Sequence, residues 1–200
     1  MVQAQKQTKQ DILDLAAKEV KTKGFTNTSF NDLIKLSGLS KGAFYYYFKS
    51  KQDLLMALID IYYEQEVELE WISRFKTPLN TINVLLKAIE NKMKTYYESG
   101  DYRYGSVLNN LLHELSAVDP AYQYKLFAVF ESWTELTAKY IRRGQKFNYV
   151  KNSFDSKSLA NYFIHNNIAI LNVLKISGDY SQAFNMFKQL RKSVGVFRAD

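Results

Sequence analysis

The chain has 200 residues, of which 46% are hydrophobic, and it carries a formal net charge of +7 with no cysteine. This hydrophobic content suffices for a folded protein, and the lack of cysteine excludes disulfides, thiolate metal sites and sensing by thiol oxidation. We find neither a signal peptide nor the roughly eighteen-residue apolar run of a membrane span, so we expect a soluble cytoplasmic protein without a membrane partner.

The positive charge is concentrated near the N-terminus. Residues 1–51 contain nine lysines and four acidic residues, a net charge of +5, whereas the other 149 residues carry +2. Such a bias is expected of a segment that faces a polyanion such as DNA. Lysine-rich helices are also common as solvated surfaces, so charge alone leaves both interpretations open.

Helix-start and helix-stop signals follow one another within this basic segment. Thr8 with Asp11 three residues later predicts the start of a first helix, and Gly24 predicts its end. Ser29 predicts the start of a second helix, which ends at Ser37–Gly38. The sequence therefore predicts two helices before residue 39.

A third helix follows the turn that contains Gly38. It is expected over Ser40–Phe48, and two helices joined by a short glycine-containing turn present the second one to the DNA major groove. Phe44 and Phe48 lie four residues apart and share the face that packs on the core, which leaves the tyrosines at 45–47 on other faces. A buried strand is the alternative for this aromatic segment, but the caps on both sides favour a helix.

An ordered set of motif residues extends over roughly residues 8–58. It comprises Ile12-Leu13, Ala16-Ala17, Gly24-Phe25, Thr28, Gly38-Leu39-Ser40-Lys41-Gly42, Phe44-Tyr45, Tyr47-Phe48, Ser50-Lys51 and Leu54-Leu55. This set resembles the N-terminal signature of the TetR family of transcriptional regulators, with Ile34 at a position where the family mostly has alanine. The resemblance implies an all-α fold, with a three-helix helix-turn-helix DNA-binding domain at 1–51 and a larger helical effector-binding and dimerisation domain at 52–200.

The resemblance also implies which residues contact DNA. By position they are Thr28, Ser40, Lys41, Gly42, Tyr45, Tyr46, Tyr47 and Lys51. Thr28 is expected to cap the second helix against a phosphate, and Lys41, Tyr45, Tyr47 and Lys51 to contact mostly the DNA backbone. Tyr46, Lys41 and Gly42 are expected to approach base edges. Thr28 and Ser40 are helix caps in either case, and Lys51 is equally compatible with an ordinary surface lysine.

The C-terminal segments suit pairing with a second copy. One helix-turn-helix reads too few base pairs to be selective, so we expect a homodimer on a palindromic double-stranded operator. Two helices, over 158–175 and about 183–194, carry the apolar positions for it, as the last two helices do in TetR-like proteins; an ordinary core helix in a monomer is the alternative. The expected interface residues are Leu159, Phe163, Ile170, Leu174, Phe184 and Phe187.

The middle of the chain is predicted to be helical and rich in aromatic residues. Helices are expected over 51–75, 79–98, 107–116 and 120–143, with a polar connection at 146–155. This region would house a pocket for an apolar or aromatic small-molecule effector, although core packing is the commoner role for any single aromatic residue. The candidate pocket residues are Trp71, Tyr97, Tyr104, His113, Phe130, Trp133 and Asn167.

Enzymatic signatures are weak. His113-Glu114 begins like a zinc-protease motif, but Ala117 stands where the second histidine is needed, and the chain has only two histidines. We therefore expect no enzyme, with no catalytic residues, metal or cofactor. The predicted function is a sequence-specific DNA-binding regulator, a repressor released by a small-molecule effector. One alternative is an activator or global regulator with the same DNA-binding domain. Another is a helical small-molecule carrier or enzyme with a vestigial DNA-binding domain.

Overall fold

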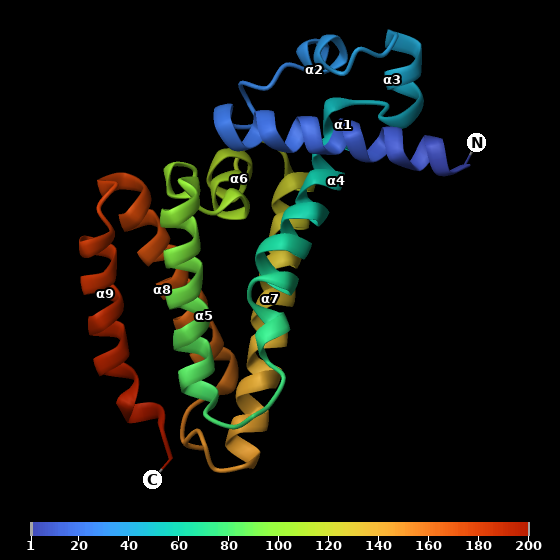
Figure 1. Ribbon diagram of the computed structural model, residues 1–200. Coiled ribbons are helices and arrows are strands. Elements are labelled where there is room, and N and C mark those ends of the chain that lie inside the picture. Colours follow the sequence, from blue (N-terminus) through green and yellow to red (C-terminus); the bar gives the residue numbers. More distant parts are fainter. Residues whose placement is uncertain (1, 200) are drawn as a thin grey trace.

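The computed structural model describes residues 2–199, with side chains from residue 8 onward, and it is built from helices (Figure 1). Their bounds are α1 (Val2–Lys23), α2 (Phe30–Leu36), α3 (Lys41–Tyr47), α4 (Lys51–Tyr63), α5 (Thr81–Ser99), α6 (Val107–Leu115), α7 (Pro120–Lys146), α8 (Ser156–Ser177) and α9 (Tyr180–Ser193). Within residues 2–199 the only strand-like pairing is an isolated bridge between Val150 and Arg198. The predicted all-α fold is confirmed.

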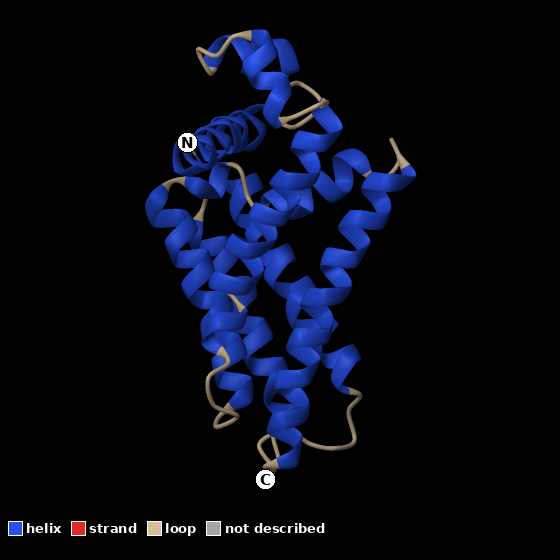
Figure 2. Ribbon diagram, turned by 90° about the vertical axis from the view of Figure 1, so that its right-hand side faces the viewer, coloured by secondary structure: helices blue, strands red, loops and turns tan. Residues whose placement is uncertain are grey.

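The helices form a head and an elongated body. The head consists of α1 to α3, and α1 lies across one end of the body with α2 and α3 on its outer side (Figure 1). The body consists of α4 to α9, with α4 leading out of the head beside α7 and the C-terminus at the far end. Loops join the helices, and extended ones lie at the end of the body far from the head (Figure 2). No helix of the described chain combines the length and apolar character needed to cross a lipid bilayer.

The start of the first helix differs from the prediction. Helix α1 begins at Val2, six residues before the expected cap, so Thr8 lies inside the helix. Its apolar face buries Ile12, Ala16 and Val20 in the core that also holds Phe44 of α3. The capping signal at Thr8 was wrong because polar residues with adequate helix propensity precede it and let the helix extend.

The fourth helix is also shorter than predicted. It ends at Tyr63 and is followed by a π-helical turn at Glu64–Leu69 and a short 3-10 turn at Ile72–Arg74, rather than continuing to Phe75. The amide of Glu70 donates to the carbonyl of Gln65, five residues earlier, at 3.1 Å. Such π-turns insert an extra residue in the helix and re-aim the side chains around it.

The π-turn places Glu66 inside the body. Its Oε1 accepts the backbone N–H groups of Val107 (2.8 Å) and Leu108 (3.2 Å) at the start of α6. Its Oε2 lies 3.4 Å from Nζ of Lys92, whose amine also lies 2.9 Å from Glu70. Glu66 and Lys92 are 3% and 4% exposed, so the body contains a buried ion pair joined to the N-terminus of α6.

The other predicted helices agree with the structure to within a few residues. Asp119 and Asp155 cap α7 and α8 through their side chains, with proline in the first turn of α7 as expected. Between the body helices, Trp71 packs edge-on against Trp133 at 5.8 Å, and Phe75 stacks on Tyr140 at 4.2 Å between ring centroids. Aromatic rings therefore fill the middle of the body.

Candidate DNA interface and ligand cavities

The turn between α2 and α3 is built as the sequence predicts. Ser29 caps α2 by accepting the amide of Asp32 at 3.4 Å. At the other end, the Ser37 hydroxyl donates to the Ile34 carbonyl (2.8 Å) and accepts the amide of Leu39 (3.3 Å). Gly38 between them has φ +67°, a left-handed conformation that only glycine adopts without strain.

Helix α3 is fixed by its cap and by two buried rings. Ser40 accepts the amide of Ala43 at 3.2 Å, and Phe44 and Phe48 are at most 1% exposed. Phe30 of α2 packs edge-on against Phe44 at 5.2 Å between centroids. The predicted helix over this segment is confirmed, and its opposite face is left outward.

The outward face of α3 consists of Lys41, Gly42 and Tyr46. Tyr46 is 61% exposed, Lys41 is exposed, and a Cβ added to Gly42 would meet nothing within 4 Å. Tyr45 and Tyr47 are half-buried and flank this face, Tyr45 against Phe30 and Tyr47 against Tyr46. This face can present the Lys41 amine, the phenol groups of Tyr45 and Tyr47, and the bare backbone of Gly42 to a groove of DNA.

The structure gives Thr28 a different role from the predicted one. Its side chain is 4% exposed, and its hydroxyl donates to the carbonyl of Gly24 at 2.7 Å. Ser29, not Thr28, caps α2, so the expected capping role of Thr28 was wrong. Thr28 instead closes the turn after α1, because its hydroxyl satisfies a carbonyl at the end of that helix.

Lys51 is turned toward the head. Its amine donates to the Thr26 carbonyl at 3.3 Å and lies 4.3 Å from the centroid of the Phe25 ring. Burial lowers the pKa of this amine, and the nearby Glu114 carboxylate only partly offsets that effect. The side chain thus stabilises the turn after α1 and has less freedom than Lys41 to reach a phosphate.

Sequence reasoning missed Lys49. This exposed lysine lies after α3, with its amine 5.9 Å from the Tyr46 ring centroid and 3.4 Å from the Tyr46 carbonyl. Lys49 lies beyond the extended C-cap residue Phe48, so helical spacing could not have placed it beside Tyr46. Lys49 adds a second cation beside the outward face.

A carboxylate of the body holds the turn of the head. Glu114, near the end of α6, accepts the backbone N–H groups of Phe25 (3.1 Å) and Thr26. Partial burial raises the pKa of Glu114, but these hydrogen bonds and the Lys51 amine outweigh it, and the net pKa is lowered. Glu114 in its ionised form therefore links the head to the body. The partial zinc-protease motif at His113-Glu114 gave no indication of this role.

One cavity of the body lies between α6, α7 and α8 and has a volume of about 580 Å³. Its apolar lining includes Leu112, Phe127, Phe130, Ile164 and Ile168. Its polar lining consists of Asn109, His113, Ser116, Gln123, Glu131, Thr134, Asn161 and His165. Of the seven predicted pocket residues, His113 and Phe130 line this cavity. Tyr104, again with His113, lines another cavity of about 520 Å³ beside α1.

The other four predicted pocket residues line neither of these cavities. Trp71 and Trp133 are 1% exposed in the core, and Trp71 donates its indole N–H to Thr137 at 3.0 Å. Tyr97 is exposed and packs against Tyr102 and Tyr180. The indole N–H of Trp133 and both polar atoms of the buried Asn167 amide have no hydrogen-bond partner among the described residues.

The side chains predicted for a dimer interface mostly face the body itself. Five are at most 4% exposed within the single chain, and Phe184 is half-buried; the five are Leu159, Phe163, Ile170, Leu174 and Phe187. They hold α8 and α9 against the body. No group of three or more histidine, aspartate or glutamate side chains in the described part of the chain is arranged to hold a metal ion.

Comparisons with known proteins agree on one family. The family model described as "Bacterial regulatory proteins, tetR family" matches residues 12–58. The transcriptional regulator AcuR of Cereibacter sphaeroides is 25% identical over 157 residues, covering 77% of this chain and 70% of that protein. An uncharacterised HTH-type regulator of Lactococcus lactis is 33% identical over 128 residues, 62% of each chain. The solved structure of a TetR transcriptional regulator from Chloroflexus aurantiacus superimposes with a TM-score of 0.85 at 20% identity, covering 99% and 100% of the two chains.

Proposed function

Because the chain belongs to the TetR family and is a DNA-binding transcriptional regulator, we propose that it is a repressor released from its operator by a small-molecule effector. The observation that carries the proposal is the outward face of α3, where Lys41, Gly42 and Tyr46 are accessible immediately after a helix-turn-helix turn. Residues 1–51 would serve as the DNA-binding unit and 52–200 as the effector and dimerisation unit, working in the cytoplasm where its DNA partner is found.

In the proposed complex, α3 of each head enters the major groove of a palindromic operator. Lys41 and Lys49 contact phosphates and release counterions, while Gly42 lets the backbone approach the base edges next to Tyr46. Ser40, Tyr45 and Tyr47 set the register along the backbone. Thr28 and Lys51 act indirectly in this scheme, since both are engaged in holding the turn after α1.

Selection of duplexes from a random pool at low and moderate salt tests the DNA proposal. We expect a two-fold symmetric consensus, and Lys41→Ala should weaken binding across sequences and reduce the salt slope by about 2, because each dimer loses two phosphate contacts. Lys51→Ala should change the salt slope less than Lys41→Ala, and Lys139→Ala, an exposed site on α7, should leave it unchanged. Absence of enrichment at any salt would favour the alternative of a carrier or enzyme with a vestigial head.

The effector site is proposed to be the cavity between α6, α7 and α8. Its apolar lining and scattered amides and imidazoles suit a planar or apolar ligand with a few polar groups. A bound ligand would move α6, and through Glu114 the turn of the head.

Tryptophan fluorescence offers a direct test of this site. The Trp133 ring centroid lies 5.8 Å from that of Phe130, which lines the cavity, so an effector should change the emission of Trp133. Compounds that change emission should also release operator DNA, and Phe130→Ala should weaken both effects. Ligands that release DNA from the Phe130→Ala variant with unchanged affinity would show that the effector binds elsewhere.

Dimerisation is proposed through the outward face of α8. Because the residues first predicted are buried within the chain, the pairing rests on one stripe of α8 at helical spacing, in which Tyr162, Ala169 and Val173 are half-buried and Ile176 is exposed. Ile176 is 86% exposed. Ile176→Asp should shift the protein to monomer in sedimentation at micromolar concentration, whereas Leu69→Asp, at an exposed site on the π-turn, should not. A wild-type monomer would contradict the proposed pairing.

The chain is proposed to have no enzymatic activity and no cofactor, in line with relatives that are named transcriptional regulators. Whether it represses or activates is read from a reporter under the selected operator. Repression predicts higher expression when the gene for this chain is deleted, and activation predicts the reverse.

A further inference from the structure

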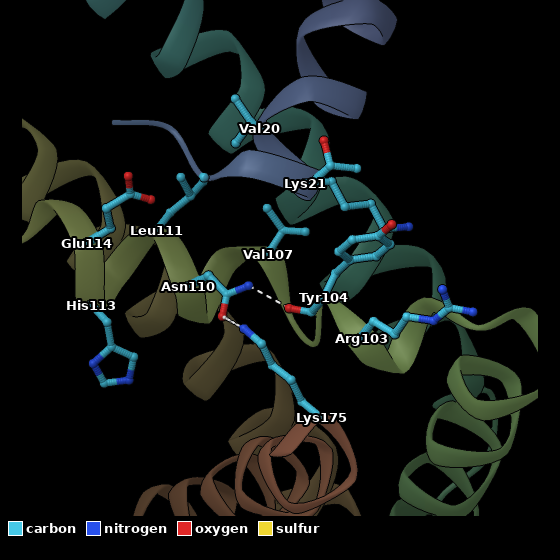
Figure 3. Close-up of a pocket in the computed structure, with 12 residues that line it drawn as sticks. Val20, Lys21, Arg103, Tyr104, Val107, Asn110, Leu111, His113, Glu114 and Lys175 are labelled. Atoms are coloured by element: carbon cyan, nitrogen blue, oxygen red, sulfur yellow. Dashed lines mark hydrogen bonds between the residues drawn. The ribbon is translucent and has the colours of Figure 1, made fainter. Parts of the chain in front are cut away.

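A second cavity, of about 520 Å³, lies between the head and the body. Its lining comes from α1 (Val20, Lys21, Thr22), the turn at Gly24, the segment before α6 (Arg103, Tyr104), α6 itself and Lys175 of α8. Figure 3 shows these side chains arranged around a space beneath α1. This cavity differs from the proposed effector site, with which it shares only His113 at its edge.

Lys175 is positioned in this cavity by a chain of hydrogen bonds. Its amine donates to Oδ1 of Asn110 at 3.0 Å, and the Asn110 amide donates to the Tyr104 carbonyl at 2.7 Å (Figure 3). The aliphatic part of Lys175 passes close to Gly105, where an added Cβ would lie 3.1 Å from Cδ. The half-buried amine is therefore fixed at the end of an ordered side chain.

The cavity has more positively charged side chains than carboxylates that lack a partner. Among the described side chains, no carboxylate lies within 4.0 Å of the Lys175 amine or the Arg103 guanidinium. The two nearby carboxylates are engaged, since Asp101 pairs with Lys21 at 2.7 Å and Glu114 accepts amides of the head. A partly desolvated amine without a counter-charge is a favourable place for an anion.

One side of the cavity is apolar. Val20 of α1 and Val107 and Leu111 of α6 lie together on the side away from Lys175 (Figure 3). We propose that this cavity binds a small organic carboxylate, with its charged end on Lys175 and its apolar body against these three side chains. Lys21 is held away from the charged end, with its amine paired to Asp101 and 5.5 Å from the centroid of the Tyr104 ring, and Arg103 also lines the cavity.

Such a ligand would contact the head and the body at once. Val20 and Lys21 belong to α1, whereas Asn110 and Lys175 belong to the body, so binding depends on how the two parts are arranged. A ligand shifts a conformational equilibrium by its difference in affinity for the two arrangements. The site therefore gives the protein a second input, separate from the proposed effector cavity.

Calorimetric titration with benzoate tests the site, with neutral benzamide as the isosteric control. We expect benzoate to bind and benzamide to bind at least about tenfold more weakly, because charge-assisted hydrogen bonds require the carboxylate. Lys175→Met keeps the aliphatic stem but removes the amine, and it should weaken benzoate about tenfold. Lys192→Met, an exposed site on α9, should leave binding unchanged.

Further titrations distinguish benzoate binding at this site from nonspecific anion binding and from binding in the other cavity. Inorganic phosphate should bind more weakly than benzoate because it cannot use the apolar wall, and Phe130→Ala in the other cavity should not affect benzoate. Thermal unfolding with and without benzoate checks that Lys175→Met is folded and reports binding independently. Equal binding of benzamide, unchanged affinity in folded Lys175→Met, or loss of binding in Phe130→Ala would overturn the proposal.

Discussion

Two glutamates, one at each end of α6, accept hydrogen bonds from backbone N–H groups, and they differ in how deeply they are buried. Glu66 binds the first amides of α6 from within the body and is 3% exposed beside Lys92. Glu114, near the other end, binds amides of the head and is only half-buried. The first contact lies within the body, whereas the second joins the head to the body, the two parts whose relative position changes in the proposed release from DNA.

Because of this contrast, one end of α6 can stabilise the body while the other end can release the head in the proposed response to an effector. A buried charge that loses its partner is costly, so the Glu66 end of α6 should stay fixed. A partly exposed carboxylate can exchange its partners for water at little cost, so the Glu114 end can release the head. Displacement of α6 should therefore act on the head mainly through Phe25 and Thr26.

The largest expected effect is at the buried end. Lys92→Met removes the positive partner of Glu66 and should lower the free energy of unfolding by about 3 kcal/mol, because a buried carboxylate is left uncompensated. Lys94→Met on the same helix removes an exposed pair with Glu98 and should cost no more than about 0.5 kcal/mol. Urea denaturation measures both. Similar costs for the two variants would contradict the contrast between buried and exposed carboxylates.

An intermediate effect is expected where the head meets Glu114. Gly24 has φ +80°, and an added Cβ would lie 3.3 Å from Oε2 of Glu114, so Gly24→Ala combines backbone strain with displacement of the carboxylate. Gly38 has φ +67° but an added Cβ there meets nothing within 4 Å. We expect destabilisation of about 2 kcal/mol for Gly24→Ala and about 1 kcal/mol for Gly38→Ala. Equal losses would mean that the Glu114 contact adds nothing to the strain of the turn.

The sequence predicted the helix-turn-helix of α2 and α3 better than the side-chain contacts of the body, for a physical reason. Local signals determine the head: Ser29 and Ser40 cap their helices, and Gly38 supplies the turn. The orientation of the alternating acidic residues at 64–70 is not determined by local sequence. Glu66 lies inside the body because a π-turn forms there and because Lys92, 26 residues later, pairs with its carboxylate. Glu114 and Lys175 gain their roles from residues far away in the sequence, and no spacing rule could pair them.

The smallest effect is the one that reports directly on the head. Glu114→Gln removes the charge and leaves one acceptor, which should cost about 1 kcal/mol at pH 7 once exposure is taken into account. Because the folded pKa of Glu114 lies below its ordinary value of 4.5, the ionised group stabilises the protein above that pH, and the contribution is lost as the pH falls through the folded pKa. The difference between wild type and variant should therefore be full at pH 7 and shrink below pH 4.5. Glu64→Gln, a change at an exposed site, should alter the free energy of unfolding at pH 7 less than Glu114→Gln does.

Hydrogen exchange locates this effect within the molecule. In Glu114→Gln the amides of Phe25 and Thr26 should exchange faster, while those of Val107 and Leu108, held by Glu66, should keep their protection. If all four amides lost protection together, α6 and the head would open as one unit, and the proposed release of the head at the Glu114 end alone would be wrong. If only the head amides respond, an effector that moves α6 needs to break no more than this contact to free the DNA-binding unit.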